Sequence, residues 1–226
     1  MMPWAACGGA GEARNDLMAR AKAGFSSARP LTVRIKKRDR VVLPPFEDFW
    51  VFGYGSLMWN PGFPHLEVRR AHLFGYHRRF CVYSHRYRGT PERPGLVFGL
   101  DRGGSCRGLA FRVPAAEGEA VLDYLYKREM ITGVYIPRWL PLTTETGSID
   151  ALGFVVDRAH DQYTGRLSLE ETAVLIAQGH GQRGSGRDYL INTMHHLEAL
   201  GLGAGNLRQL LRLVELRANL RRRRVK

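Results

Sequence analysis

Hydrophobic and polar positions in the middle of the chain form short runs separated by turn residues, a pattern typical of β-strands. The run "FWVFGY" is apolar enough for a buried strand, and two longer runs follow at 67–84 and 95–113. Because glycine weakens a strand interior, we expect the first of these runs to break at Gly75. The second has the form of a hairpin that turns around Gly103 and Gly104.

The apolar spacing then changes to the helical period, and the last third of the chain is mostly helical. "AAEGEAVLDYLYKRE" predicts a central helix, and "GVYIPRWLPLTT" and "IDALGFVVD" predict another hairpin around "ETGS". Ser168 and Glu171 have capping-box spacing at the start of a helix that ends at Gly179. A second helix ends at Gly201, and a third begins at Asn206. The pattern predicts an α+β domain with a helical C-terminal third.

Composition divides the chain into three segments. Residues 1–45 combine small, flexible and basic stretches and end in "LPP", so we expect a flexible basic N-terminal extension. We expect the folded domain over 46–206. Residues 207–226 are expected to form a basic C-terminal helix and tail.

The net charge of +13 is concentrated at the two ends of the chain. Residues 1–46 hold nine Lys or Arg and three Asp or Glu, which gives +6, and 207–226 hold eight and one, which gives +7. The remaining 47–206 hold 17 basic and 17 acidic residues. A nucleic-acid-binding domain carries its basic charge on the fold itself, so we expect no specific nucleic-acid partner. Weak binding of the ends to RNA or anionic membrane stays open.

Signals for export, membrane insertion and metal binding are missing from the sequence. No apolar stretch approaches the roughly 18 residues of a membrane span, and the first residues lack the apolar run of a secretory signal. Cys7, Cys81 and Cys106 are too few and too scattered for a disulfide framework or a zinc site. We therefore expect a cytoplasmic protein without a metal. The pattern does not predict an oligomeric state.

Two glycines in "WVFGYGSLMW" are unusual in an apolar run that reads as a buried strand. At Gly53 and Gly55 a ligand could meet bare backbone N–H groups, and consecutive N–H groups in a turn form an anion-binding nest. A carboxylate is a typical ligand of such a nest. The alternative is a bulge or tight bend without a ligand, and the spacing leaves both interpretations open.

Glu129 shares the apolar face of the central helix. At 100° per residue from Val121, Leu125 falls at about 40°, Leu122 at about 100° and Glu129 at about 80°. Burying a carboxylate costs free energy of folding unless it forms an ion pair or takes part in catalysis. Burial would also raise its pKa toward that of a general base. A salt bridge to a core arginine, or a position just past the helix end, is the structural alternative.

Other candidate catalytic or ligand-binding residues give weaker signals. His195 and His196 point about 100° apart on a helix and cannot share one metal ion. Cys81 lies near Ser84 and His85, but alternate strand residues face opposite ways. The glycine-rich "GHGQRGSGRDYL" lacks the lysine and the spacing of a P-loop.

Together, "WVFGYGSLMWNPGF", "YHRRFCVYSHRYRGTPERPGL" and "YLYKREMITGVY" resemble the ChaC family of γ-glutamylcyclotransferases. The resemblance runs in order from about Trp50 to Leu200. It implies a small mixed β-barrel with helices packed around it. It also implies an enzyme that acts on glutathione and releases 5-oxoproline and Cys-Gly without a metal or cofactor.

The resemblance also assigns site residues. The family's catalytic glutamate falls on Glu129, and Arg88 matches an arginine of a second recurrent stretch that is a candidate substrate contact. Met58 stands where the family pattern leads us to expect Ile or Leu. The family's substrate-binding loop falls on Val51, Phe52, Gly53, Tyr54, Gly55, Ser56 and Leu57.

Two alternatives to a glutathione-specific enzyme stay open at this point. Related cyclotransferases use other γ-glutamyl peptides or amines, so the substrate range is not fixed. A non-catalytic regulator of cation transport that only binds γ-glutamyl groups is the second alternative. The intact Gly-Tyr-Gly-Ser turn and the intact Glu129 favour an enzyme.

Overall fold

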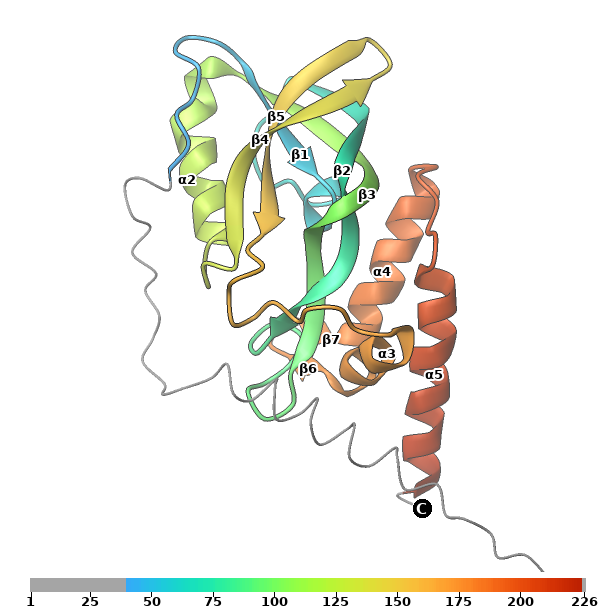
Figure 1. The fold of residues 1–226 in the computed structure, drawn as a ribbon. Helices are drawn as coiled ribbons and strands as arrows, with labels where there is room; N and C mark the ends of the chain where they lie inside the picture. Colours follow the sequence, from blue (N-terminus) through green and yellow to red (C-terminus); the bar gives the residue numbers. More distant parts are fainter. Residues whose placement is uncertain (1–39, 225–226) are drawn as a thin grey trace, which may run out of the picture.

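The strands of the computed structural model, which describes residues 40–224, form a small closed barrel in the order β1-β3-β2-β4-β5 (Figure 1). Strands adjacent in this order are antiparallel, and the parallel pairing of β1 with β5 closes the barrel. β3 and β5 also pair in parallel, at Leu100 and Val155. The predicted mixed barrel is thereby confirmed. Its strands are β1 (Phe49–Gly53), β2 (Glu67–Ser84), β3 (Gly95–Val113), β4 (Tyr135–Thr144) and β5 (Gly147–Val156).

The two long strands differ from the predicted elements. β2 does not break at Gly75, and β3 is one continuous strand rather than a hairpin at Gly103 and Gly104. The pairing register steps from Phe74–Ser105 to Tyr76–Arg102, so one residue of β2 lies opposite two of β3. All three glycines have positive φ, which lets the paired strands bulge and bend together without separating.

Four helices were predicted in the described part of the chain, and all four are present. Ser168 and Glu171 form the expected capping box, with the serine Oγ accepting from the Glu171 N–H and the glutamate accepting from the Ser168 N–H. The hairpin around "ETGS" is also confirmed as β4 and β5. The helices are α2 (Gly118–Glu129), α3 (Leu169–Gln178), α4 (Gly186–Ala199) and α5 (Leu207–Arg224). Short elements are η2 (Ser56–Met58), η3 (Ala115–Glu117), β6 (His180–Gly181) and β7 (Gly184–Ser185).

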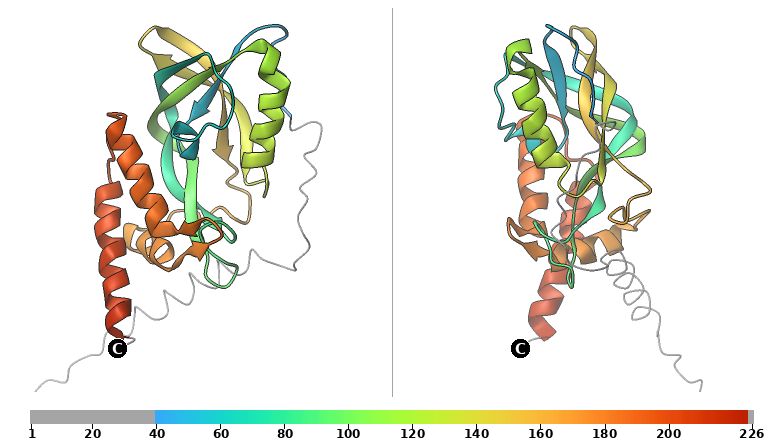
Figure 2. Two further views of the ribbon diagram at one scale, coloured as in Figure 1. Left: turned by 180° about the vertical axis from the view of Figure 1, so that it is seen from behind. Right: turned by 90° about the vertical axis from the view of Figure 1, so that its left-hand side faces the viewer.

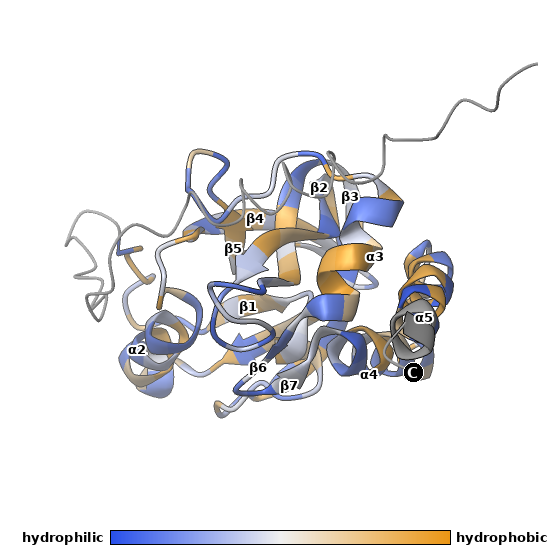
Figure 3. Cartoon of the chain, turned by 90° about the horizontal axis from the view of Figure 1, so that it is seen from below, coloured by the Kyte–Doolittle hydropathy of each residue, from blue (hydrophilic) through white to orange (hydrophobic). Residues whose placement is uncertain are grey.

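The helices cover two sides of the barrel. α2 lies along one side, while α3, α4 and α5 gather on the opposite side near the far end of the β2–β3 pair (Figures 1 and 2). Hydrophobic positions concentrate on the central strands and on α3, whereas the surrounding loops are mainly hydrophilic (Figure 3). Leu210 and Val214 of α5 are buried in the same core as the barrel residues Leu96 and Leu100.

Both predicted domain borders have contacts across them. Arg40 pairs with Glu119 and Asp123 of α2, each at 2.8 Å, and the Val41 N–H donates to the Tyr126 hydroxyl at 2.9 Å. α5, which begins at the second border, packs against α3 and α4. The division at 45/46 and 206/207 stays a prediction, and most of the N-terminal extension lies outside the described residues.

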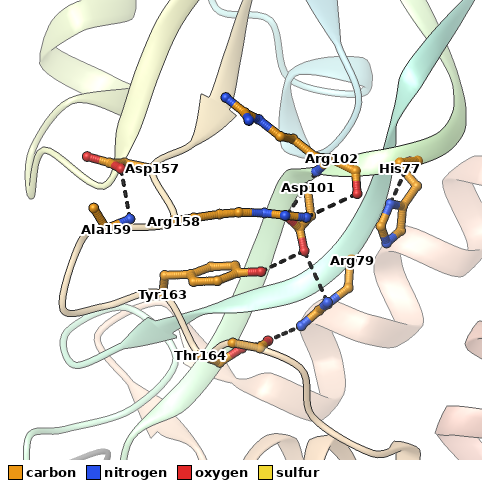
Figure 4. A network of polar contacts seen from close by, with 11 residues as sticks. His77, Arg79, Asp101, Arg102, Asp157, Arg158, Ala159, Tyr163 and Thr164 are labelled. Carbon is orange, nitrogen blue, oxygen red and sulfur yellow. Dashed lines mark hydrogen bonds and ion pairs between the residues drawn. The ribbon is translucent and has the colours of Figure 1, made fainter.

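A buried carboxylate ties the loop after β5 to the β2–β3 pair (Figure 4). The Asp101 side chain is 1% exposed and accepts from Arg158 Nε at 2.6 Å, the Tyr163 hydroxyl at 2.9 Å and Arg79 Nη1 at 3.0 Å. Burial raises the pKa of Asp101, but the hydrogen bonds from Arg158 and Tyr163 and the two positive charges outweigh burial and hold the pKa below its usual value. The network therefore keeps Asp101 ionised.

Candidate active site

The two glycines that follow β1 have different structural roles. A Cβ on Gly53 would lie 3.0 Å from the Phe111 ring and 3.2 Å from Leu57 Cβ, so a side chain here would force these neighbours to shift. A Cβ on Gly55 would meet only the Tyr189 hydroxyl, at 3.7 Å. Gly55 has a φ of −130°, outside the left-handed region. Gly55 therefore has room for a small side chain, whereas Gly53 fits the packing alternative.

The loop after Gly55 folds into the short η2 turn. The Met58 N–H donates to the Gly55 carbonyl at 2.9 Å, and the Asn60 N–H donates to the Ser56 carbonyl at 2.9 Å. Within residues 40–224, the N–H groups of Gly55, Ser56 and Leu57 have no acceptor. Three successive N–H groups without an acceptor in the protein can receive an anion.

Two arginines that were not predicted hold this loop in place. Arg128 of α2 donates to Ser56 Oγ at 2.8 Å and to the Asn60 carbonyl at 2.7 Å. Arg78 of β2 donates to the Tyr54 carbonyl and, at 2.7 Å, to the Arg107 carbonyl. The only sequence signal for Arg128 is its place beside Glu129, and Arg78 gave none.

Glu129 is the last residue of α2, and its side chain is 19% exposed. Its Oε1 lies 3.2 Å from Arg128 Nε, so the carboxylate pairs with the same guanidinium that holds Ser56. Burial raises the pKa of Glu129, and the opposing charges of Arg128 and Arg183 do not cancel that effect. Arg128 thus joins the predicted base to the predicted loop.

Three tyrosines have pKa values that respond to the charge of Glu129: Tyr54 is buried, and Tyr135 and Tyr189 are partly buried. Burial and the negative charge of Glu129 raise the pKa of Tyr54, of Tyr135 and of Tyr189, the last to about 12. Tyr54 donates to the Phe154 carbonyl at 3.1 Å, and Tyr135 donates to the Phe98 carbonyl at 2.6 Å. Tyr189 lies next to Gly55, so its hydroxyl is near both the loop and the carboxylate. Neither Tyr135 nor Tyr189 was predicted.

Arg88 contacts the ring of Tyr189, whose hydroxyl lies near Gly55. Its guanidinium is 4.9 Å from the centre of the Tyr189 ring, and it donates to the carbonyls of Arg183 and Ser185. These contacts join Arg88 to the turn between β6 and β7. Its role as a substrate contact stays a prediction.

The remaining loop residues turn their side chains into the protein. Val51 and Phe52 are fully buried, Leu57 and Tyr54 are nearly so, and Arg128 engages the Ser56 hydroxyl. The structure therefore leaves the backbone of this loop, rather than its side chains, open to a ligand.

The weaker candidates do not join this site. Cys81 is fully buried, and burial raises the pKa of its thiol to about 12. The His196 ring stacks on Trp59 with centroids 4.6 Å apart. In residues 40–224, no three His, Cys, Asp or Glu side chains are grouped so that they could hold a metal ion. Among the helices of this region, none is long and apolar enough to cross a membrane.

Comparisons with known proteins identify the family and the fold. The sequence model of the family described as ChaC-like protein matches residues 49–217. The glutathione-specific gamma-glutamylcyclotransferase of Escherichia coli (strain K12) is 39% identical over 72% of this chain and 71% of its own length. Glutathione-specific gamma-glutamylcyclotransferase 1 of Homo sapiens is 31% identical over 67% of this chain and 71% of its own. A crystal structure of the yeast gamma-glutamyl cyclotransferase specific to glutathione, 22% identical, superposes with a TM-score of 0.69 over 75% of this chain and 96% of its own.

Proposed function

This chain belongs to the ChaC family, and we propose that it is a glutathione-specific γ-glutamylcyclotransferase. The substrate's own α-amine attacks its γ-carbonyl, which closes a five-membered lactam and releases 5-oxoproline and Cys-Gly. One observation supports this most directly: Arg128 links the largely buried Glu129, whose pKa is raised, to the loop whose N–H groups have no acceptor within the described residues. We also propose that the reaction takes place in the cytoplasm.

No nucleophile from the protein is needed, because the substrate supplies its own. Holding the amine against the carbonyl makes the attack intramolecular, which can contribute roughly 7–11 kcal/mol. In our proposal the N–H groups of Gly55, Ser56 and Leu57 bind the α-carboxylate or the developing oxyanion of the γ-glutamyl group. That contact needs a backbone without a side chain at Gly55.

Glu129 moves the proton in this scheme. It accepts a proton from the α-ammonium and returns it to the amide nitrogen of the departing Cys-Gly. The raised pKa suits both steps, since a strongly acidic carboxylate would hold the proton too weakly to return it. Arg128 touches Glu129 and Ser56 but no reacting atom, so it is a positioning residue.

Incubation of the purified protein with glutathione, followed by assays for 5-oxoproline and Cys-Gly, tests the proposal. Both products should appear in equal amounts. N-acetylated glutathione is the matched control, because acetylation removes the attacking amine and leaves the amide bond in place. Equal Cys-Gly release from both compounds would mean hydrolysis by external water, and the cyclotransferase proposal would then be abandoned.

A further inference from the structure

The turn between β6 and β7 is fixed against the segment that follows β2. The Gln182 N–H donates to the Arg86 carbonyl at 2.9 Å, and the Arg183 N–H donates to the Tyr87 carbonyl at 3.0 Å. The Arg88 guanidinium donates to the Arg183 carbonyl from the other side. Two backbone hydrogen bonds and one from the Arg88 side chain therefore fix the turn at Arg183.

The Arg183 side chain is an exposed cation held on one surface. Its guanidinium lies 4.5 Å from the centre of the Tyr87 ring. Within the part of the chain that the structure describes, no carboxylate pairs with it, whereas Arg79, Arg128 and Arg158 all have carboxylate partners. A fixed arginine without a carboxylate leaves its planar fork available to an anion.

A chain of contacts connects the backbone of Arg183 to Gly55. Arg88 contacts both the Arg183 carbonyl and the Tyr189 ring, and the Tyr189 hydroxyl would lie 3.7 Å from a Cβ on Gly55. The positive charge of Arg183 also acts to lower the pKa of Glu129.

We propose that Arg183 forms a second carboxylate subsite, which binds the glycyl carboxylate of glutathione while the loop N–H groups hold the γ-glutamyl end. This inference rests on the proposed function and identifies the residue that binds the glycyl end of the substrate. Glutathione carries a carboxylate at each end, and γ-glutamyl amines lack the second one. An arginine at the leaving half would therefore favour the tripeptide acid over those amines.

The test compares glutathione with glutathione amide, in which the glycyl carboxylate is a neutral carboxamide. The wild-type protein should turn over glutathione with a kcat/KM about tenfold higher than that of the amide, the size of a charge-assisted hydrogen bond. In Arg183→Gln the value for glutathione should fall to that of the amide, through KM rather than kcat. The value for the amide should hardly change.

Arg86→Gln is the matched control. Arg86 also stacks on Tyr87, at 5.6 Å, and contacts the same turn through Gln182 at 3.0 Å. Its removal should leave the preference for glutathione intact. A wild-type protein without a preference, or a preference that survives in Arg183→Gln, would overturn the proposal.

Calorimetric binding of both compounds to Glu129→Gln separates this inference from the proposed reaction. The subsite predicts a tenfold weaker Kd for the amide, and equal affinity once Arg183→Gln is added. This result can hold even if the wild-type protein forms no 5-oxoproline, in which case only the reaction is disproved. Equal affinities for the two compounds in Glu129→Gln itself would disprove the subsite.

Discussion

At the scale of single residues, Glu129 is the group on which the proposed chemistry depends. Glu129→Gln preserves size and hydrogen bonding but removes the base, so kcat should fall at least about 100-fold. Circular dichroism and Tm should stay close to wild type. Glu119→Gln is the control, because Glu119 lies on the same helix with a side chain that is 77% exposed. Near-normal turnover by Glu129→Gln would remove it from the mechanism.

Substitutions at Gly53 and Gly55 test whether each glycine is needed for core packing or for substrate binding. Gly53→Val should lower the free energy of unfolding by about 1–3 kcal/mol, because its side chain would press on Phe111 and Leu57. Gly55→Val should keep the wild-type Tm and lose substrate binding, since only the Tyr189 hydroxyl lies near the new Cβ. Denaturant unfolding and glutathione binding, measured on both variants, check this. A Gly55→Val protein that binds normally would place the substrate elsewhere.

At the scale of elements, Arg128 joins the end of α2 to the loop after β1. Its charge and hydrogen bond lower the pKa of Glu129 against the effect of burial. Activity that needs ionised Glu129 falls as pH drops through this pKa. Arg128→Gln should therefore move the acid limb of the kcat/KM profile to higher pH, and should reduce the rate about 10–100-fold because the loop loses its anchor.

Arg128→Lys distinguishes the charge from the geometry. Lysine keeps the positive charge but lacks the planar fork that reaches Ser56 and Asn60 together. Its acid limb should stay near the wild-type position while the rate still falls. An unchanged acid limb in Arg128→Gln would show that the pair does not set the protonation of Glu129.

The Asp101 network gives a stability prediction at the same scale. Asp101→Asn should lower the free energy of unfolding by about 2–3 kcal/mol, less than for a fully buried pair because Arg158 is half exposed. The lowered pKa of Asp101 means that its contribution is present above the ordinary aspartate pKa and is lost as pH falls through the folded value. Urea unfolding at several pH values tests this. Asp150→Asn, at an exposed position of β5, is the control and should be neutral.

At the scale of the whole molecule, the charge at the ends can be separated from the site. Residues 1–39 carry eight Lys or Arg and three Asp or Glu, and 221–226 carry five Lys or Arg, so their removal reduces the net charge from +13 to +3. The trimmed protein should keep glutathione turnover within about twofold and lose any retention on RNA, because nonspecific binding follows net charge. A large loss of turnover would give the ends a part in catalysis.

Local signals in the sequence were sufficient to predict most of the helices and strands. The capping box at Ser168 and the helix end at Gly179 involve neighbours in sequence, and the structure has both. The β4–β5 hairpin is likewise local. The prediction failed at Gly75, Gly103 and Gly104, because glycines that would end isolated strands lie opposite one another in the paired strands and form a bulge.

The sequence by itself determined the helices, most of the strands, the buried face that includes Glu129 and the glycines of the loop, because these depend on spacing within about 20 residues. Only the tertiary structure decided which glycine is closely packed and which has room for a side chain, and which arginines hold the loop. Arg78 and Arg128 reach the loop from 24 and 72 residues away, and Tyr189 comes from another helix. Such contacts depend on the closure of the barrel, in which β1 pairs with β3 and β5, and no local pattern encodes that closure.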